Sequence, residues 1–437
     1  MAKLDLARTE ALKALIKYQG TEQIADLAVS DMDNSLTNER DRRFARQLVL
    51  GSIRWRMRLD WIIDKFSRQP RSRLKPTVEN ILRLGIFQIK FMERVPVRAA
   101  VDTSVQLAKQ NGVNYACGYI NGLLRSLDRS NGNESYPHSA KEPIKFLSVF
   151  YSHPPWLVEK WLTRWGLELT TGLLKANNQP SRTWLRRNPL RNVPLESNEE
   201  SVIETGTDGY LFAKNFSKLL KSEIFIDGHY QVQDPAARFA VKLLDPKPGE
   251  YILDLCSAPG GKTTQIAELM ENKGTVVATD MSLERLKKVA ENSQRLGLSI
   301  VQLLVKDGTN PFEKKFDRVL LDVPCSGTGI IGRHADARWR KKPEEIEKLT
   351  VTQHRLLNSA FNSLRPGGIL VYSTCSLETE ENEQVVENFA AKTPMADIES
   401  AQDYLSPSDQ ASRYFQAIPG QQVGDGAFAA RIRKRLA

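Results

Sequence analysis

The spacing of apolar residues changes character along this chain. Through residues 3–130, apolar positions recur every three or four residues, as in 44–63 and 78–91. This is the spacing of helices that bury one face. Pro76 and Pro96 stand where new helices would begin, because proline is well tolerated in a first helical turn. The pattern predicts an all-α N-terminal bundle over 1–130.

A mixed region follows this bundle. Residues 130–143 are turn formers without periodicity, which is typical of a linker. Within 144–230, one amphipathic helix opens at Pro154-Pro155, and two short stretches, 184–188 and 223–230, have strand composition. We interpret 144–230 as a small α+β linking domain in which arginines among aromatic residues suit RNA.

From residue 231 to 437 the pattern alternates between strand and helix. Alternation of this kind predicts a mostly parallel α/β sheet, Rossmann-like, with helices on both faces. A chain of 437 residues is too long for one ordinary core, so a multidomain protein is expected. The expected strands are 251–255, 275–279, 300–305, 318–321 and 369–373.

Charge adds a candidate partner to this picture. The net charge is +10, and residues 51–100 hold 12 lysines and arginines against four acids. A surplus so concentrated points to a polyanion, although arginines that merely cover a bundle would give the same count.

Cysteine usage and hydropathy limit where the protein acts. Four cysteines lie far apart without a C-x-x-C pair, so we expect reduced thiols, no disulfide scaffold and no metal site. Neither a signal peptide nor an 18-residue apolar run is found, so we expect a cytoplasmic protein without a membrane span.

A glycine turn follows the first of the expected strands. Residues 251–264 read as a buried strand, a turn with Pro259, Gly260 and Gly261, and a helix beginning near Lys262. Such a turn lets the backbone approach a cofactor closely. A P-loop is disfavoured because Cys256 stands where its first glycine belongs, and a dehydrogenase fingerprint is absent.

Acidic residues stand at the ends of four successive strands, where ligands bind in such sheets. Asp280 is placed to accept hydrogen bonds from both hydroxyls of a ribose, and Asp307 could accept a hydrogen bond from an adenine amino group. S-adenosylmethionine fits this set better than a dinucleotide does, because it carries a sulfonium and an amino group but no phosphate. The four residues are Asp254, Asp280, Asp307 and Asp322.

Two thiols follow neighbouring strands. Asp322 and Cys325 share one loop, and Cys375 follows the next strand. A thiolate that adds to C6 of a pyrimidine turns C5 into a nucleophile, and an acid near N3 stabilises the adduct. Two thiols and an acid suit these steps, although buried, inert cysteines are more common. The spacing leaves open which thiol attacks.

The motifs around these residues resemble the RNA cytosine-5 methyltransferase family. The resemblance rests on residues 233–237, 254–263, 306–309, 322–329 and 373–376. Residues 46–55 and 82–88 are similar to the NusB-type RNA-binding helical domain. This pairing resembles the Sun/Fmu type of bacterial 16S ribosomal RNA methyltransferase.

The resemblance implies roles that spacing does not supply. Cys375 would be the nucleophile, whereas Cys325 would assist proton removal and product release; in DNA cytosine-5 methyltransferases the thiol after proline attacks instead. Asp322 would face both cofactor and cytosine. The implied S-adenosylmethionine contacts are Cys256, Ser257, Ala258, Pro259, Gly260, Gly261, Lys262, Asp280, Asp307 and Asp322.

The resemblance also implies a substrate. A monomer of this type would methylate C5 of cytosine 967 in 16S ribosomal RNA, naked or in a partly assembled small subunit. Two alternatives stay open from the sequence. The same chemistry would serve another RNA such as transfer RNA, and a catalytically silent RNA-binding assembly factor would keep the same fold.

Overall fold

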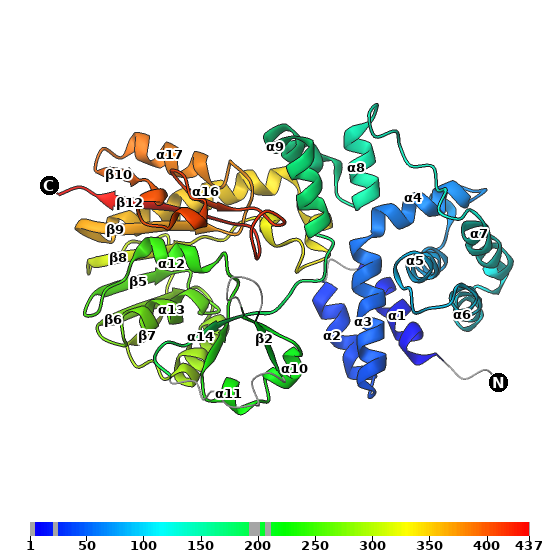
Figure 1. Ribbon diagram of the computed structural model, residues 1–437, viewed down its shortest axis with the longest axis horizontal. Helices are drawn as coiled ribbons and strands as arrows, with labels where there is room; N and C mark the ends of the chain where they lie inside the picture. The colour runs from blue at the N-terminus through cyan, green and yellow to red at the C-terminus, as the bar shows by residue number, and fades with distance from the viewer. Residues whose placement is uncertain (1–4, 21–24, 192–201, 206–210, 437) are drawn as a thin grey trace. The chain divides into compact units, whose positions relative to one another are not determined.

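The computed structural model describes residues 5–20, 25–191, 202–205 and 211–436 and contains two compact units (Figure 1). One unit joins Met1–Asn178 to Arg333–Arg340, and the other joins Gln179–Gly332 to Lys341–Ala437. The division at 178 falls inside the range 144–230 that the sequence analysis takes as one linking domain. Within the described residues, no helix is long and apolar enough to cross a bilayer.

The first unit is helical, as predicted. Its central helix is α5, which is buried continuously from Val78 to Gln88 and contacts five of the other helices. It begins at Pro76, and α6 follows a cap at Pro96, as the proline positions predict. The helices are α1 (Leu6–Gly20), α2 (Ala25–Ser35), α3 (Glu39–Arg54), α4 (Arg56–Phe66), α5 (Pro76–Phe91), α6 (Val97–Gln110), α7 (Cys117–Arg129), α8 (Pro143–Tyr151) and α9 (Pro155–Ala176).

A short segment from much later in the chain completes this unit. Residues 333–340 include the one-turn helix α15 (Ala337–Arg340) and belong to the helical unit. The Asp336 carboxylate accepts from the Ala25 backbone N–H at 3.1 Å. Ala335 packs into the core of the bundle. The segment follows the Cys325 loop directly in sequence.

The second unit begins with a small antiparallel sheet in the order β2-β3-β1-β4. The strand predicted at 184–188 is confirmed as β1 (Trp184–Arg187). The strand predicted at 223–230 is wrong, because these residues form the helix α11 (Glu223–Ile226) followed by a turn. The Ser222 carbonyl accepts from Phe225 and Ile226, and packing of Phe225 on the local core overrides strand propensity. The other elements are β2 (Ile203–Thr205), β3 (Leu211–Ala213), α10 (Phe216–Leu219) and β4 (Tyr230–Val232).

The large sheet has the order β10-β12-β9-β8-β5-β6-β7, with β11 paired to β12. The five predicted strands are confirmed and pair in parallel, whereas β10, β11 and β12 pair antiparallel at one side. The strands are β5 (Tyr251–Leu255), β6 (Thr275–Asp280), β7 (Val301–Val305), β8 (Phe316–Asp322), β9 (Leu364–Thr374), β10 (Ala396–Glu399), β11 (Phe415–Ala417) and β12 (Ala427–Lys434).

Helices cover both faces of this sheet (Figure 1). Successive strand residues enter different cores, because strand side chains alternate between faces. Ile252 packs with α12 and α13, whereas Leu253 packs with α16 and α17. The sheet therefore has two buried faces, and its carboxyl edge remains for ligands. The helices are α12 (Arg238–Leu244), α13 (Gly261–Leu269), α14 (Leu283–Leu296), α16 (Pro343–Asn362) and α17 (Glu383–Lys392).

Candidate active site at the carboxyl edge of the sheet

The candidate residues stand at the ends of the parallel strands. Asp280 and Asp322 are the last residues of β6 and β8, Asp254 lies one residue before the end of β5, and Cys375 directly follows β9. Because parallel strands end at one edge, the fold brings these side chains to the same side of the sheet.

The glycine turn between β5 and α13 packs on the neighbouring strand. The Ser257 N–H donates to the Thr279 carbonyl at 2.7 Å, and Gly260 has a φ of +100°. A Cβ at Gly260 would meet the Val289 backbone at 3.1 Å. Glycine therefore relieves both the positive φ and the close approach to α14.

Buried polar atoms around this turn lack partners within the described part of the chain. They are Asp254 Oδ1, Ser257 Oγ and Thr279 Oγ1. Burial raises the pKa of Asp254 to about 7, although the Thr263 hydroxyl donates to its other oxygen at 2.6 Å. Unpaired buried polar atoms are costly, so a polar ligand is expected to satisfy them.

Asp280 already has protein partners. Its Oδ1 accepts from the Ser282 N–H at 2.9 Å, and Arg285 Nη1 lies 3.1 Å from Oδ2. The Arg285 side chain is 60% exposed, so this ion pair is weak and easily exchanged for a ligand.

Asp307 behaves differently from the other acids. Its carboxylate is exposed and accepts from the Thr309 N–H and hydroxyl at 2.9 and 2.8 Å, and these hydrogen bonds lower its pKa. The structure thus shows Asp307 closing its own turn, and its contact with an adenine stays a prediction.

The two thiols lie side by side. Cys325 Sγ and Cys375 Sγ are 3.2 Å apart. The hydrogen bond to Cys375, together with burial, raises the pKa of Cys325 well above its ordinary value. Cys325 therefore keeps its proton at neutral pH.

Lys262 connects the glycine turn to the thiols. Its ammonium pairs with Asp322 Oδ2 at 2.7 Å, while the Ser373 hydroxyl donates to Asp322 Oδ1 at 2.6 Å. Burial alone would lower the pKa of Lys262, but the negative charge of Asp322, with a smaller effect from Cys375, raises it.

A cavity of about 70 Å³ touches one of the two thiols. Cys375 and Lys262 line it, and so do Asp234, Ala236 and Ala237. Three residues of the motif at 233–237 therefore share this cavity with the thiol. Further lining residues are Ile330, Phe415 and residues 425–429.

One carboxylate holds both thiol loops, and the sequence analysis missed it. Glu381 is fully buried, and its Oε1 accepts from the Ser326 N–H at 2.8 Å. Its Oε2 accepts from the hydroxyls of Ser326 and Ser376. Each serine directly follows one of the cysteines. The only signal in the sequence was that Glu381 belongs to an acid-rich stretch, 378–383, which begins three residues past Cys375.

The thiol loop that carries Cys325 also approaches the other loop by its backbone. The Gly329 N–H donates to the Cys375 carbonyl at 2.9 Å, and Gly426 donates to the Gly329 carbonyl at 2.8 Å. A Cβ at Gly329 would meet that Cys375 oxygen at 2.7 Å. Glycine at 329 therefore allows the contact that aligns the two loops.

Comparison with known proteins now places the chain. It is 32% identical to the probable ribosomal RNA small subunit methyltransferase B of Bacillus subtilis, with 98% of each chain covered. It is 33% identical to the ribosomal RNA small subunit methyltransferase B of Klebsiella pneumoniae, with 91% of each covered. Residues 241–433 match the family model of the 16S rRNA methyltransferase RsmB/F. The chain belongs to the RsmB/F family.

Two further family models match the parts of this RsmB/F chain that precede its methyltransferase core. Residues 5–129 match the NusB family, and residues 153–196 match the ferredoxin-like domain of RsmF/B-like methyltransferases. The sequence resemblance to a NusB-type bundle and a methyltransferase core is thereby confirmed. As an RsmB/F member, the chain is a ribosomal RNA methyltransferase.

Solved structures agree with the fold of this family. The crystal structure of PH0851 is 26% identical and has a TM-score of 0.78. This match covers 100% of the PH0851 chain and 99% of this chain. The crystal structure of NSun6 from Pyrococcus horikoshii with SFG is 25% identical and has a TM-score of 0.54. This match covers 98% of the NSun6 chain and 64% of this chain.

The basic window of this RsmB/F chain, residues 51–100, contains two distinct groups of side chains. Arg58 stacks within 4.3 Å of the Phe150 ring, and Arg71 and Arg83 both pair with Asp60, so these arginines stabilise the bundle. The other group is exposed and remains as the candidate RNA surface: Lys65, Arg68, Arg73, Lys75, Arg94 and Arg98.

Proposed function

We propose that this chain uses S-adenosylmethionine to methylate C5 of a cytosine in 16S ribosomal RNA through a covalent bond between Cys375 and C6. The observation that carries the proposal is the thiol pair, 3.2 Å apart and beside the Lys262–Asp322 ion pair. Family membership supplies the ribosomal RNA, and cytosine 967 is the position that the sequence resemblance implies.

Cys375 is the better nucleophile of the two thiols. It shares a cavity with Lys262, whose positive charge favours a thiolate, and it receives a hydrogen bond when Cys325 keeps its proton. Attack forms a C–S bond at C6 and moves an electron pair to C5. Asp322, at the end of β8, would stabilise the ring at N3.

Cys325 acts after the new C–C bond has formed. Loss of the C5 proton restores the C5–C6 double bond, and the Cys375 thiolate leaves C6. Cys325 holds a proton that it can pass to the Cys375 sulfur as that sulfur leaves C6, and the resulting Cys325 thiolate can take up the C5 proton.

The glycine turn is the place for the cofactor. S-adenosylmethionine would supply an electrophilic methyl group. Asp254, Ser257 and Thr279 each offer one buried oxygen there that has no partner among the described residues, which fits a ligand with amino and hydroxyl groups. The residues that we propose to hold it are Cys256, Ser257, Ala258, Pro259, Gly260, Gly261, Lys262, Asp280, Asp307 and Asp322.

Transfer of a labelled methyl group tests the proposal. Unmodified 16S ribosomal RNA and transfer RNA are each incubated with the protein and labelled S-adenosylmethionine, and the modified base is mapped. We expect label at C5 of one cytosine in 16S ribosomal RNA alone. Label in transfer RNA would overturn the substrate, and cofactor binding without transfer to either RNA would favour the silent assembly factor.

A further inference from the structure

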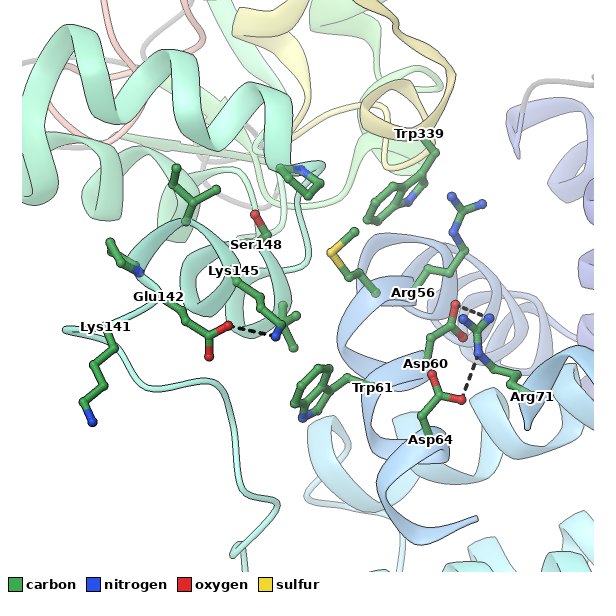
Figure 2. Close-up of a pocket in the computed structure, with 15 residues that line it drawn as sticks. Arg56, Asp60, Trp61, Asp64, Arg71, Lys141, Glu142, Lys145, Ser148 and Trp339 are labelled. Atoms are coloured by element: carbon green, nitrogen blue, oxygen red, sulfur yellow. Dashed lines mark hydrogen bonds and ion pairs between the residues drawn. The ribbon is translucent and has the colours of Figure 1, made fainter. Parts of the chain in front are cut away.

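A second hollow, in the helical unit, lies outside the thiol site. It has a volume of about 650 Å³, and residues of α4, the loop before α8, α8 itself and α15 line it (Figure 2). All of these residues belong to the helical unit.

Two indole rings form walls of this pocket. Figure 2 shows Trp61 on α4 and Trp339 on α15 among the lining side chains. Both side chains are half-buried. Indole rings offer flat apolar faces, which stack on nucleobases of any sequence.

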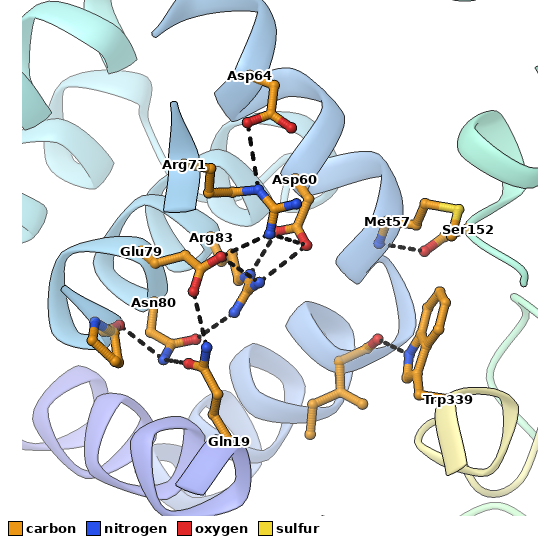
Figure 3. Close-up of polar contacts among 12 residues, drawn as sticks. Gln19, Met57, Asp60, Asp64, Arg71, Glu79, Asn80, Arg83, Ser152 and Trp339 are labelled. Atoms are coloured by element: carbon orange, nitrogen blue, oxygen red, sulfur yellow. Dashed lines mark hydrogen bonds and ion pairs between the residues drawn. The ribbon is translucent and has the colours of Figure 1, made fainter. Parts of the chain in front are cut away.

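The Trp339 wall is held in place before any ligand arrives. Its Nε1–H donates to the Ile53 carbonyl at 2.7 Å (Figure 3). The preceding Arg338 is fully buried and donates to the Ser152 and Asn177 carbonyls at 3.0 Å each. A preorganised wall reduces the entropy lost when a ligand binds.

The α4 side of the pocket is also fixed. Asp60 pairs with Arg83 and Arg71 at 2.7 and 2.9 Å, and Asp64 lies 3.4 Å from Arg71 (Figure 3). These carboxylates are therefore neutralised by arginines of the bundle. Asp60 and Asp64 are thus poorly suited to bind a cationic ligand.

Positive side chains flank both rings. The Arg56 guanidinium lies 4.5 Å from the Trp339 ring centre, and the ammonium groups of Lys65 and Lys145 lie 4.8 and 6.0 Å from that of Trp61. They would repel a second cation but attract a phosphate. Lys145 pairs with Glu142 at 2.9 Å, and both side chains are about half exposed, so this pair opens readily.

A buried polar group completes the lining. Ser148 is 1% exposed, and its hydroxyl has no hydrogen-bond partner within the described part of the chain. A nucleobase carries ring nitrogens and exocyclic groups that would satisfy this hydroxyl, whereas an apolar peptide side chain would leave it unpaired.

We infer that this pocket binds one unpaired nucleobase of the substrate RNA, stacked on the Trp61 ring, with its phosphate at Lys145. This inference rests on the proposed function, because the RNA is that of the methylation reaction. It adds a second base contact, separate from the cytosine that reacts at Cys375.

Binding of RNA without methyl transfer tests the inference. Labelled 16S ribosomal RNA transcript is titrated with the full chain in the absence of S-adenosylmethionine. We expect Trp61→Ala to weaken binding about 5- to 150-fold, the range found for loss of one stacked base. Trp61→Phe, which keeps a stacking face, should recover most of the affinity.

The matched control is Trp165→Ala. Trp165 is a half-buried tryptophan of α9 with Arg164 over its ring at 4.8 Å, and it does not line the pocket. Wild-type affinity in this variant is expected. Equal affinities in Trp61→Ala, Trp165→Ala and the wild type would overturn the pocket but leave the proposed function intact.

Replacement of single nucleotides by abasic ones sharpens the test. One abasic position should weaken binding to the wild type but not to Trp61→Ala, because both changes remove the same contact. Additive losses at every position would contradict the inference. If the wild-type chain binds no 16S transcript, 16S ribosomal RNA is not its substrate. That result would overturn both the proposed function and the inference about the pocket.

Discussion

The loops that carry Cys325 and Cys375 are similar in construction and different in surroundings. Each thiol follows a parallel strand and precedes a serine, and the buried Glu381 carboxylate accepts from both serines. Yet Cys375 shares a cavity with Lys262, whereas the hydrogen bond to Cys375 and burial raise the pKa of Cys325. The neighbours of each thiol, more than the loops themselves, are the basis on which we propose two different chemical roles.

Removal of Cys375 and removal of Cys325 should have opposite effects on the covalent protein–RNA complex. Cys375→Ala is expected to lower methyl transfer by about four to six orders of magnitude, as loss of a covalent nucleophile does. Cys325→Ala should still form the bond to C6 but should release product slowly, so a denaturant-resistant protein–RNA complex accumulates. Gel electrophoresis of labelled RNA measures both.

Cys117→Ala is the control for these variants, because Cys117 belongs to a helix of the other unit. It should match the wild type. A complex that accumulates with Cys375→Ala and not with Cys325→Ala would exchange the roles of the two thiols.

Loss of the shared carboxylate should affect both loops together. Glu381→Gln places amide hydrogens against donors at Ser326 and Ser376, which should cost about 1–3 kcal/mol of folding free energy. We expect a lower melting temperature and a reduced rate of adduct formation. Glu380→Gln is the control, because the Glu380 carboxylate accepts a hydrogen bond from the neighbouring Thr379 hydroxyl, at 3.3 Å. It should change neither the melting temperature nor the rate of adduct formation. A slower release step with a normal rate of attack would show that Glu381 serves one loop only.

Removal of the Lys262 charge should affect Cys375 more than Cys325. The raised pKa of Lys262 keeps its ammonium charged through the range of about pH 6–9. In Lys262→Gln, the pH midpoint of adduct formation should rise by about 1 unit, equivalent to about 1.4 kcal/mol. Lys262→Arg should retain most of the wild-type profile. Single-turnover rates between pH 6 and 9 measure this shift, and an unchanged midpoint in Lys262→Gln would remove Lys262 from the account of Cys375.

The smallest effect is expected on the cofactor side of the site. Arg285→Ala frees Asp280 from an exposed ion pair, which is worth at most about 1 kcal/mol. The KM for S-adenosylmethionine should change less than about fivefold, with the ratio of attack to release unaltered. Steady-state kinetics measure the KM, and a changed ratio would show that Asp280 and Arg285 act on the thiols and not only on the cofactor.

Much of this site follows from local sequence, and the rest depends on tertiary contacts. Strands 251–255 and 318–321 were predictable because continuous apolar runs mark buried parallel strands. Glu381 was not, since only the folded chain brings it to Ser326, 55 residues earlier. The strand expected at 223–230 failed because packing outweighed propensity in a short segment.

Charge counts show the same limit in the helical unit. The window 51–100 reads as uniformly basic, but Arg71 and Arg83 are occupied by Asp60 inside the bundle. Trp339 is distant from Trp61 in sequence, and nothing in its spacing predicts that both line one pocket. Contacts between segments far apart in the chain are what a single sequence does not reveal.

The bond between protein and base tests the central claim most directly. In 16S ribosomal RNA that contains 5-fluorocytidine, the base has a fluorine at C5 that cannot leave as a proton, so the adduct cannot resolve. The trapped complex is digested, and the cysteine joined to the base is identified by mass spectrometry. The account predicts that Cys375 is bonded to the cytosine, and a bond to Cys325 would contradict it.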